Sequence, residues 1–349
     1  MDLKQLHYDV MAGKTDYIPL IINIDREDAI AVSSWEATFN PQKFAEAAAH
    51  NRSLELEFPT DRIVTIESNF TETLIPCMFG AVPCEMPGGN IYSRTIVDSL
   101  DEAEELEIDI EPLKRAEAHL KIVKANVPDN LNVAITRFMS PLDNAVNIRG
   151  TDFYMDLYLE PERSRDFLNR IAVVTIYALK YLKNAVDEDY KEHITSNRRG
   201  IYIKGTRLSS DSIVTLSPKM LEDFILPLFK MFHVELGGLF VHYCTTPFPS
   251  GHVLPVFAKN PGIVDGMDNW QGYKSFFNDK MDGVLQDKVS MSFDVEFEQA
   301  YDIENLMRQP LFSDVKRDGG RGIFVSTQTK SLEDAKRLYD RWQEFFIKH

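Results

Sequence analysis

Residues 200–246, GIYIKGTRLSSDSIVTLSPKMLEDFILPLFKMFHVELGGLFVHYCTT, decide the fold, because they read as strand, loop, helix and strand in succession. Residues 201–204 are short, β-branched and aromatic, which predicts a strand. Ser217 is a predicted N-cap and Pro218 the first helical position, where a missing N–H costs nothing. Five apolar residues then recur at helical spacing and predict one buried face: Leu221, Phe224, Ile225, Leu228 and Phe232. Residues 239–244 predict a buried strand that ends in His-Tyr-Cys.

The end of that second strand is a candidate site. Side chains two residues apart on a strand point to the same side, so His242 and Cys244 share a face and Tyr243 takes the other. An imidazole beside a thiol is what a metal or thiolate site needs, and zinc ligation is one interpretation. The other interpretation is a buried, hydrogen-bonded histidine beside an inert core cysteine.

Composition limits the class of protein. The chain has 349 residues, of which 44% are hydrophobic and 26% charged, as in a soluble enzyme-sized protein. Its formal charge of -16 argues against a nucleic-acid partner, because nothing would offset phosphate repulsion. Three cysteines give no disulfide framework, and no signal peptide or membrane-length apolar run is present. We therefore expect a cytoplasmic protein that acts on a small molecule and does not bind a membrane.

Predicted strands alternate with helices along the whole chain, which favours a parallel sheet. The other predicted strands are residues 17–24, 63–66, 131–136, 261–266, 288–294 and 322–326. No Gly-x-Gly-x-x-Gly turn and no Gly-x-x-x-x-Gly-Lys loop occurs, so dinucleotide-binding and P-loop folds lose their main support. Roughly eight strand–helix units predict a TIM (β/α)8 barrel, one domain over residues 1–349 with an N-terminal helical extension at about 1–16.

Several polar residues follow predicted strands, where a barrel places its active site. Arg26, Arg137 and Arg207 would bind a carboxylate or phosphate if they converged, although each could instead pair with a surface acid. Glu67 lies at the end of the second strand and carries the same ambiguity between a substrate-binding residue and a surface ion pair. Asp294 ends the strand at 288–294 and is either a ligand, base or substrate contact, or a loop-fixing carboxylate.

Two aromatic residues lie near these strand ends. Tyr243 and Trp270 could stack on a planar substrate, although aromatic residues at such positions also pack in the core.

Four segments resemble the uroporphyrinogen decarboxylase superfamily, which includes decarboxylases and cobalamin-dependent zinc methyltransferases. They are NIRGTDFYMDLYLEPERSRDFLNRI, SSDSIVTLSPKMLEDFILPLF, LFVHYC and GIFVSTQTKSLEDAKRLYDRW. The resemblance covers the chain from about residue 131 onward, and the first third matches only in layout. It implies a barrel and a homodimer.

The decarboxylase branch has an Arg-Gln-Ala-Gly-Arg-Tyr loop after its first strand, which grips substrate carboxylates. Here residues 21–30 read IINIDREDAI and offer Arg26 alone. The branch's aspartate after the second strand has no clear counterpart, and Asn69 or Thr71 lies nearest. Since a substrate with many carboxylates needs several cations, uroporphyrinogen itself is not expected.

The methyltransferase branch binds zinc through His-x-Cys after a central strand and a second cysteine near the C-terminus. His242 and Cys244 match the first part, but the second cysteine would fall within residues 327–329, which read Thr-Gln-Thr. Asp294, Asp265 or Asp268 could supply an oxygen ligand in its place.

The resemblance therefore implies zinc-dependent methyl transfer from a corrinoid or a methylated small molecule to a thiol. The corrinoid would arrive on a separate protein, because the chain lacks a cobalamin-binding Asp-x-His-x-x-Gly stretch. One alternative is metal-free decarboxylation of a smaller carboxylated substrate, using Arg26, Arg137 and Arg207. A third hypothesis is a binding protein whose catalytic set has decayed.

Overall fold

The computed structural model describes residues 2–58, 60–67, 71–135, 138–185, 188–195, 199–243, 251–269, 289–309, 312 and 322–348. Parallel strands form the inner layer of the molecule. They are β1 (Leu20–Ile24), β2 (Thr65–Glu67), β5 (Asn132–Ala134), β6 (Phe138–Met139), β9 (Thr206–Ser209), β10 (Leu239–His242), β11 (Gly266–Asn269), β12 (Ser290–Asp294) and β13 (Ile323–Thr329). Seven of them pair in the order β1-β13-β12-β11-β10-β9-β6, and β2 pairs separately with β5. The chain is thus an α/β protein with parallel strands, as the alternating pattern predicts.

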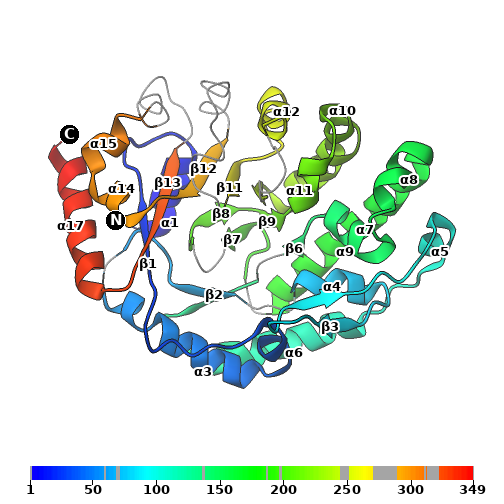
Figure 1. The fold of residues 1–349 in the computed structure, drawn as a ribbon, viewed down its shortest axis with the longest axis horizontal. Helices are drawn as coiled ribbons and strands as arrows, with labels where there is room; N and C mark the ends of the chain where they lie inside the picture. Colours follow the sequence, from blue (N-terminus) through cyan, green and yellow to red (C-terminus); the bar gives the residue numbers. More distant parts are fainter. Residues whose placement is uncertain are drawn as a thin grey trace.

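Helices surround these strands on the outside (Figure 1). They are α1 (Leu3–Met11), α2 (Ser34–Phe39), α3 (Pro41–Arg52), α4 (Thr71–Met78), α5 (Leu100–Glu105), α6 (Glu111–Ala125), α7 (Pro141–Arg149), α8 (Phe153–Leu159), α9 (Pro161–Ala185), α10 (Pro218–Met220), α11 (Leu226–Leu236), α12 (Val253–Lys259), α14 (Phe297–Tyr301), α15 (Ile303–Met307) and α17 (Leu332–Lys348). Short turns η1 (Leu54–Glu57), η2 (Asp211–Thr215) and η3 (Leu221–Ile225) join some of them. In the part of the chain that the structure describes, none of these helices combines the length and the apolar character that a membrane span requires.

The helix predicted after Ser217 is confirmed. The Ser217 hydroxyl accepts the Met220 N–H, and Pro218 occupies the first turn. The helix widens to a π-turn over Leu221–Ile225 just before Pro227, which has no N–H for a helical hydrogen bond. All five apolar residues predicted on its buried face are buried.

The first strand does not pair with the second through backbone hydrogen bonds among the described residues. The free edge of β1 is bonded to side chains instead: Asp61 accepts the Leu20 N–H at 2.9 Å, and Glu55 accepts the Ile24 N–H at 3.0 Å. Arg62 joins the same place by donating to Asn23 at 2.6 Å. We call this region, bridged by Glu55, Asp61 and Arg62, the seam. Side chains thus take the place of strand pairing between β1 and β2 in the described part of the chain.

Helix α1, which lies within the segment expected as an N-terminal helical extension, covers the N-terminal ends of the strands. The backbone carbonyl of Val10 accepts the Gly322 N–H at 2.9 Å, and that of Met11 accepts the Ser290 hydroxyl at 3.3 Å. A small apolar cluster forms beneath the helix, and it contains Leu6, Val10, Met11, Ile21, Ile201, Ile203, Phe240 and Phe324.

Residues 201–204 contain a strand, as predicted, but it does not belong to the parallel sheet. Tyr202–Lys204 forms β8, which pairs antiparallel with β7 (Glu192–Ile194), in the same way that β3 (Pro83–Glu85) pairs with β4 (Ile91–Ser93). The parallel strand that follows, β9, begins one residue after Gly205. Gly205 has φ 77° and lies so close to Gly238 that a Cβ would come 1.8 Å from its carbonyl oxygen. The chain can turn there only with glycine.

Two other strand boundaries differ from the prediction. The strand expected at residues 261–266 lies at Gly266–Asn269, because the chain turns at Gly262 with φ 84°. Residues 327–329, expected to follow the last strand, belong to β13, which continues because its partner β1 pairs with it as far as Thr329.

Candidate functional site

Polar side chains meet on one face of the sheet near the C-terminal ends of β9 to β12. The register pairs Ser209 with His242, His242 with Asp268, and Asp268 with Ser292. Paired residues in a parallel sheet point to the same side, so these four form one level of the inner face. All four are buried, and Asp268 is 1% exposed.

Arg207, Asp268 and His242 form a connected array at this level. The Arg207 guanidinium donates twice to Asp268, from Nε to Oδ2 at 2.8 Å and from Nη2 to Oδ1 at 3.1 Å. Nδ1 of His242 is hydrogen-bonded to Oδ1 of the same carboxylate. Burial favours the neutral acid, but the charge of Arg207 and the hydrogen bonds from Arg207 and His242 outweigh it and hold the pKa of Asp268 well below its usual range. Asp268 is therefore a buried anion.

The local sequence makes room for this array. Phe240 lies two residues before His242 on the same face of β10, and its ring lies across Gly266 of the neighbouring strand. A Cβ at Gly266 would come within 2.2 Å of that ring. Glycine at 266 therefore lets β11 approach β10, and the next inward residue, Asp268, reaches both Arg207 and His242.

The array defines the chemistry available to His242. The carboxylate can only accept, so Nδ1–H of the His242 ring donates to Asp268. In the neutral form of the ring, Nε2 then carries the lone pair. A carboxylate on one ring nitrogen is the common support for a histidine that binds a metal or takes a proton through the other. Asp268 itself is fully engaged by Arg207 and His242, so its assignment as an extra oxygen ligand loses support.

Asp294 forms a second polar centre on the neighbouring strand. It lies two residues beyond Ser292, roughly 7 Å nearer the C-terminal edge. The Arg199 guanidinium holds both of its oxygens, with Nη2 3.2 Å from Oδ2, and the Ser326 hydroxyl donates to Oδ1 at 2.7 Å. A quarter of the Asp294 side chain stays exposed, whereas that of Arg199 is 4% exposed.

Sequence reasoning missed Arg199. It belongs to the turn of the β7–β8 hairpin, a segment that does not contribute to the parallel sheet. The signal present in the sequence is an Arg-Arg-Gly run at 198–200, in which Gly200 has φ 58°. Such a turn reverses the chain, but nothing in the sequence shows that it delivers an arginine to β12.

Arg26 follows β1 as predicted. It forms an ion pair with the exposed Asp28, which is the second of its two predicted roles. Its guanidinium donates to both oxygens of Asp28 at 2.8 Å and to Ser53 at 2.6 Å. The hydrogen bond from Arg26 lowers the pKa of Asp28 to about 2.

Glu67 ends β2 and is 3% exposed. Its side chain lies on the opposite side of the strand from Ile66, which packs against α3 and α6.

Two further candidates have structural roles. Tyr243 is fully buried in the main apolar core, so it packs there and does not stack on a substrate. Asp265 precedes β11 at the other end of the sheet, where it accepts the Leu239 N–H at 3.0 Å and lies 3.1 Å from His233. Asp265 is thus too far from His242 to share a metal with it, and that assignment is wrong.

Arg137, Asn69, Cys244 and Trp270 lie outside the described residues, so their predicted roles remain predictions. Within the described residues, no three His, Cys, Asp or Glu side chains gather closely enough to hold a metal. The described part of the candidate site is therefore the array of Arg207, Asp268 and His242, with Asp294 above it.

Comparison with known proteins bears on the fold. No protein-family model matches the chain, and no curated protein sequence does. A solved structure, "methyltransferase from Methanosarcina mazei", matches with a TM-score of 0.64 over 99% of this chain and 99% of that one, at 13% sequence identity. The two chains share one fold over their whole length.

Proposed function

We propose that the chain is a methyltransferase of the uroporphyrinogen decarboxylase superfamily, which moves a methyl group from a corrinoid or a methylated small molecule to a thiol. In this proposal the parallel strands form a barrel whose seam is closed by Glu55, Asp61 and Arg62 in place of strand pairing. The full-length likeness to a methyltransferase supports it. The observation that carries it is the buried carboxylate on Nδ1 of His242 at the C-terminal end of a central strand.

The donor set suits zinc. His242 would bind it through Nε2, Asp268 would orient the ring, and Cys244 would be the second ligand, two residues further along. When bound, zinc lowers the pKa of a coordinated thiol so that the thiolate is present at neutral pH.

The chain's own residues prepare the site in the remaining respects. Arg207 cancels the charge of Asp268, so the carboxylate can stay ionised beside the imidazole without a net buried charge. Asp294, fixed by Arg199 and Ser326 and still partly exposed, offers an oxygen to the incoming substrate. Ser209 and Ser292 are both buried and flank the array at the same level of the sheet.

Methylcobalamin and 2-mercaptoethanol, with zinc supplied, provide a direct assay. The methyl–cobalt bond breaks, its electron pair stays on cobalt to give cob(I)alamin, and the carbon–sulfur bond forms as the thiol proton is lost to solvent. Absorbance of the corrinoid follows the reaction. Removing the residue that hydrogen-bonds a metal ligand typically lowers metal affinity or activity roughly 10- to 100-fold. His242→Ala removes the ligand itself, so it should lower the methyl-transfer rate by more than that.

The matched control is His252→Ala, which removes a histidine whose Nε2 bonds the Leu216 carbonyl at 2.8 Å. The control should keep the wild-type rate. An unreactive wild type, or a His242→Ala protein as fast as wild type, contradicts the proposal.

No described feature favours the decarboxylase alternative. Arg26 and Arg207, two of its three proposed cations, already pair with Asp28 and Asp268. The homodimer, the cytoplasmic location and the separate corrinoid protein remain parts of the proposal that follow from the sequence.

A further inference from the structure

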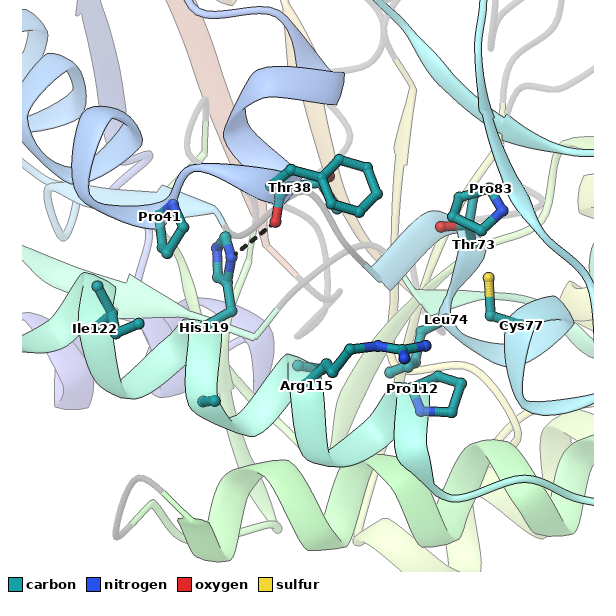
Figure 2. Close-up of a pocket in the computed structure, with 13 residues that line it drawn as sticks. Thr38, Pro41, Thr73, Leu74, Cys77, Pro83, Pro112, Arg115, His119 and Ile122 are labelled. Atoms are coloured by element: carbon teal, nitrogen blue, oxygen red, sulfur yellow. Dashed lines mark hydrogen bonds between the residues drawn. The ribbon is translucent and has the colours of Figure 1, made fainter.

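A cavity of about 330 Å³ lies between α2, α4 and α6 (Figure 2). Its lining comes from these helices and from the residues that begin α3 and β3. Arg207, Asp268, His242 and Asp294 do not contribute to it. The volume falls at the small end of the range typical of small-molecule sites, roughly 300 to 1,000 Å³.

Most of the lining is apolar. Leu74 and Ala116 are buried in its walls, while Phe39 and Ile122 leave 55% and 41% of their surfaces exposed. A ligand that covers these exposed apolar side chains is stabilised by roughly 25 cal/mol for each Å² of apolar surface removed from water.

Among the described residues that line the cavity, Arg115 is the one Lys or Arg. Arg115 extends along it from α6 toward the helix that carries Leu74 and Cys77 (Figure 2). On the same helix Lys114 pairs with Glu111 at 2.6 Å and Lys121 with Glu117 at 2.5 Å. Arg115 has no ion pair among the described residues, although the chain as a whole carries an excess of acids.

The other titratable groups of the lining are neutral near pH 7. Burial lowers the pKa of His119 to about 4, and its Nδ1–H donates to the Thr38 carbonyl at 3.2 Å. Burial raises the pKa of the Cys77 thiol to about 11, although a hydrogen bond from Thr73 and the nearby Arg115 charge both oppose the rise. The described lining thus has an apolar body and a single positive end.

We propose that this cavity binds a small organic carboxylate with an apolar or aromatic body, its carboxylate on Arg115 and its body between α4 and α6. A guanidinium holds a carboxylate through two parallel hydrogen bonds, and the apolar walls favour the remainder of such a molecule. The proposal does not depend on methyl transfer at His242.

Calorimetric titration with phenylacetate tests the proposal, with phenylacetamide as the uncharged molecule of the same shape. Wild type should bind one phenylacetate per chain and bind phenylacetamide at least about tenfold more weakly, as expected for loss of a charge-assisted hydrogen bond. Arg115→Gln should weaken phenylacetate to the level of phenylacetamide, and Ala118→Phe, which fills the cavity from its lining, should abolish both. In the control variant Lys114→Gln, the lysine that is replaced is already paired with Glu111. This variant should bind phenylacetate as wild type does.

Thermal unfolding of each variant confirms that it is folded before titration. Equal binding of phenylacetate by wild type and Arg115→Gln overturns the proposal, as does the absence of binding to wild type. A protein partner or a second copy as the occupant would instead appear in sedimentation as an association that Ala118→Phe prevents and phenylacetate does not affect. That result would also overturn the proposal.

Discussion

Asp268 is the residue on which the candidate site depends. It neutralises Arg207 and bonds His242 at a place that is closed to water. A buried charge without its partner is costly, so each member of the array constrains the other two. The sequence identifies Arg207, Asp268 and His242 as candidates, but it predicts that Arg207 binds a substrate and that Asp268 binds a metal. Both roles differ from the observed ion pair, because side-chain pairing across strands is not visible in a linear sequence.

Asp268→Asn should destabilise the protein by about 3 to 5 kcal/mol, the cost of leaving a buried cation without its partner. Urea unfolding at pH 7 measures the effect. Asp223→Asn, which removes the partner of the exposed Lys219, should leave the unfolding midpoint nearly unchanged. A midpoint for Asp268→Asn equal to that of wild type would show that Arg207 and Asp268 do not form a buried pair.

At the scale of elements, helix α1 and the β7–β8 hairpin meet through His7. Its Nδ1 accepts the Tyr202 N–H at 2.9 Å, so its Nε2–H donates to the Asp61 carbonyl at 2.7 Å. Both ring nitrogens are therefore used, and an added proton on Nδ1 would face an N–H group. The ring links three segments that the sequence alone does not connect.

His7 should make the protein less stable in acid. Burial lowers its pKa from 6.5 to about 4, so stability from the neutral ring is fully present above pH 6.5 and is lost as the pH falls toward 4. The loss should approach about 1.4 kcal/mol for each pH unit in that window. Free energies of unfolding for wild type and His7→Gln, measured from pH 7 to 4, should converge as the pH falls. Parallel curves would contradict this account.

Asp143 should have the opposite effect. It links the start of α7 to the turn after β9, bonding the Ser140 hydroxyl at 2.5 Å and the Ser212 N–H at 2.9 Å. Burial raises its pKa to about 6, so the folded state binds a proton that the unfolded state does not between about pH 6 and 4.

Wild type should therefore gain stability relative to Asp143→Asn as the pH falls from about 6 to 4. The same unfolding titration measures this difference. A difference that is constant with pH would show that Asp143 does not titrate in that range.

At the scale of the whole molecule, most of the fold follows from the sequence. Buried strands such as β10 (Leu239–His242) are short apolar runs, and helices such as the one after Ser217 carry both a cap and a periodic apolar face. These signals are local. The role of residues 201–204 was predicted wrongly because a hairpin strand and a sheet strand have the same composition, and only the turn at Gly205 separates them.

The seam could not be predicted for a similar reason. Carboxylates at Glu55 and Asp61 read as ordinary surface acids in the sequence, yet both are buried and accept backbone N–H groups of β1. In the candidate site, the position of His242 followed from strand alternation, but the contributions of Arg199 and Asp268 depend on contacts between distant segments.

The most direct measurement is a calorimetric titration of zinc into metal-free protein at pH 7. Wild type should bind one zinc per chain, His252→Ala should do the same, and His242→Ala should not bind zinc at that site. A folded wild type that takes up no zinc, or a His242→Ala protein that binds it as wild type does, would contradict the proposed metal site.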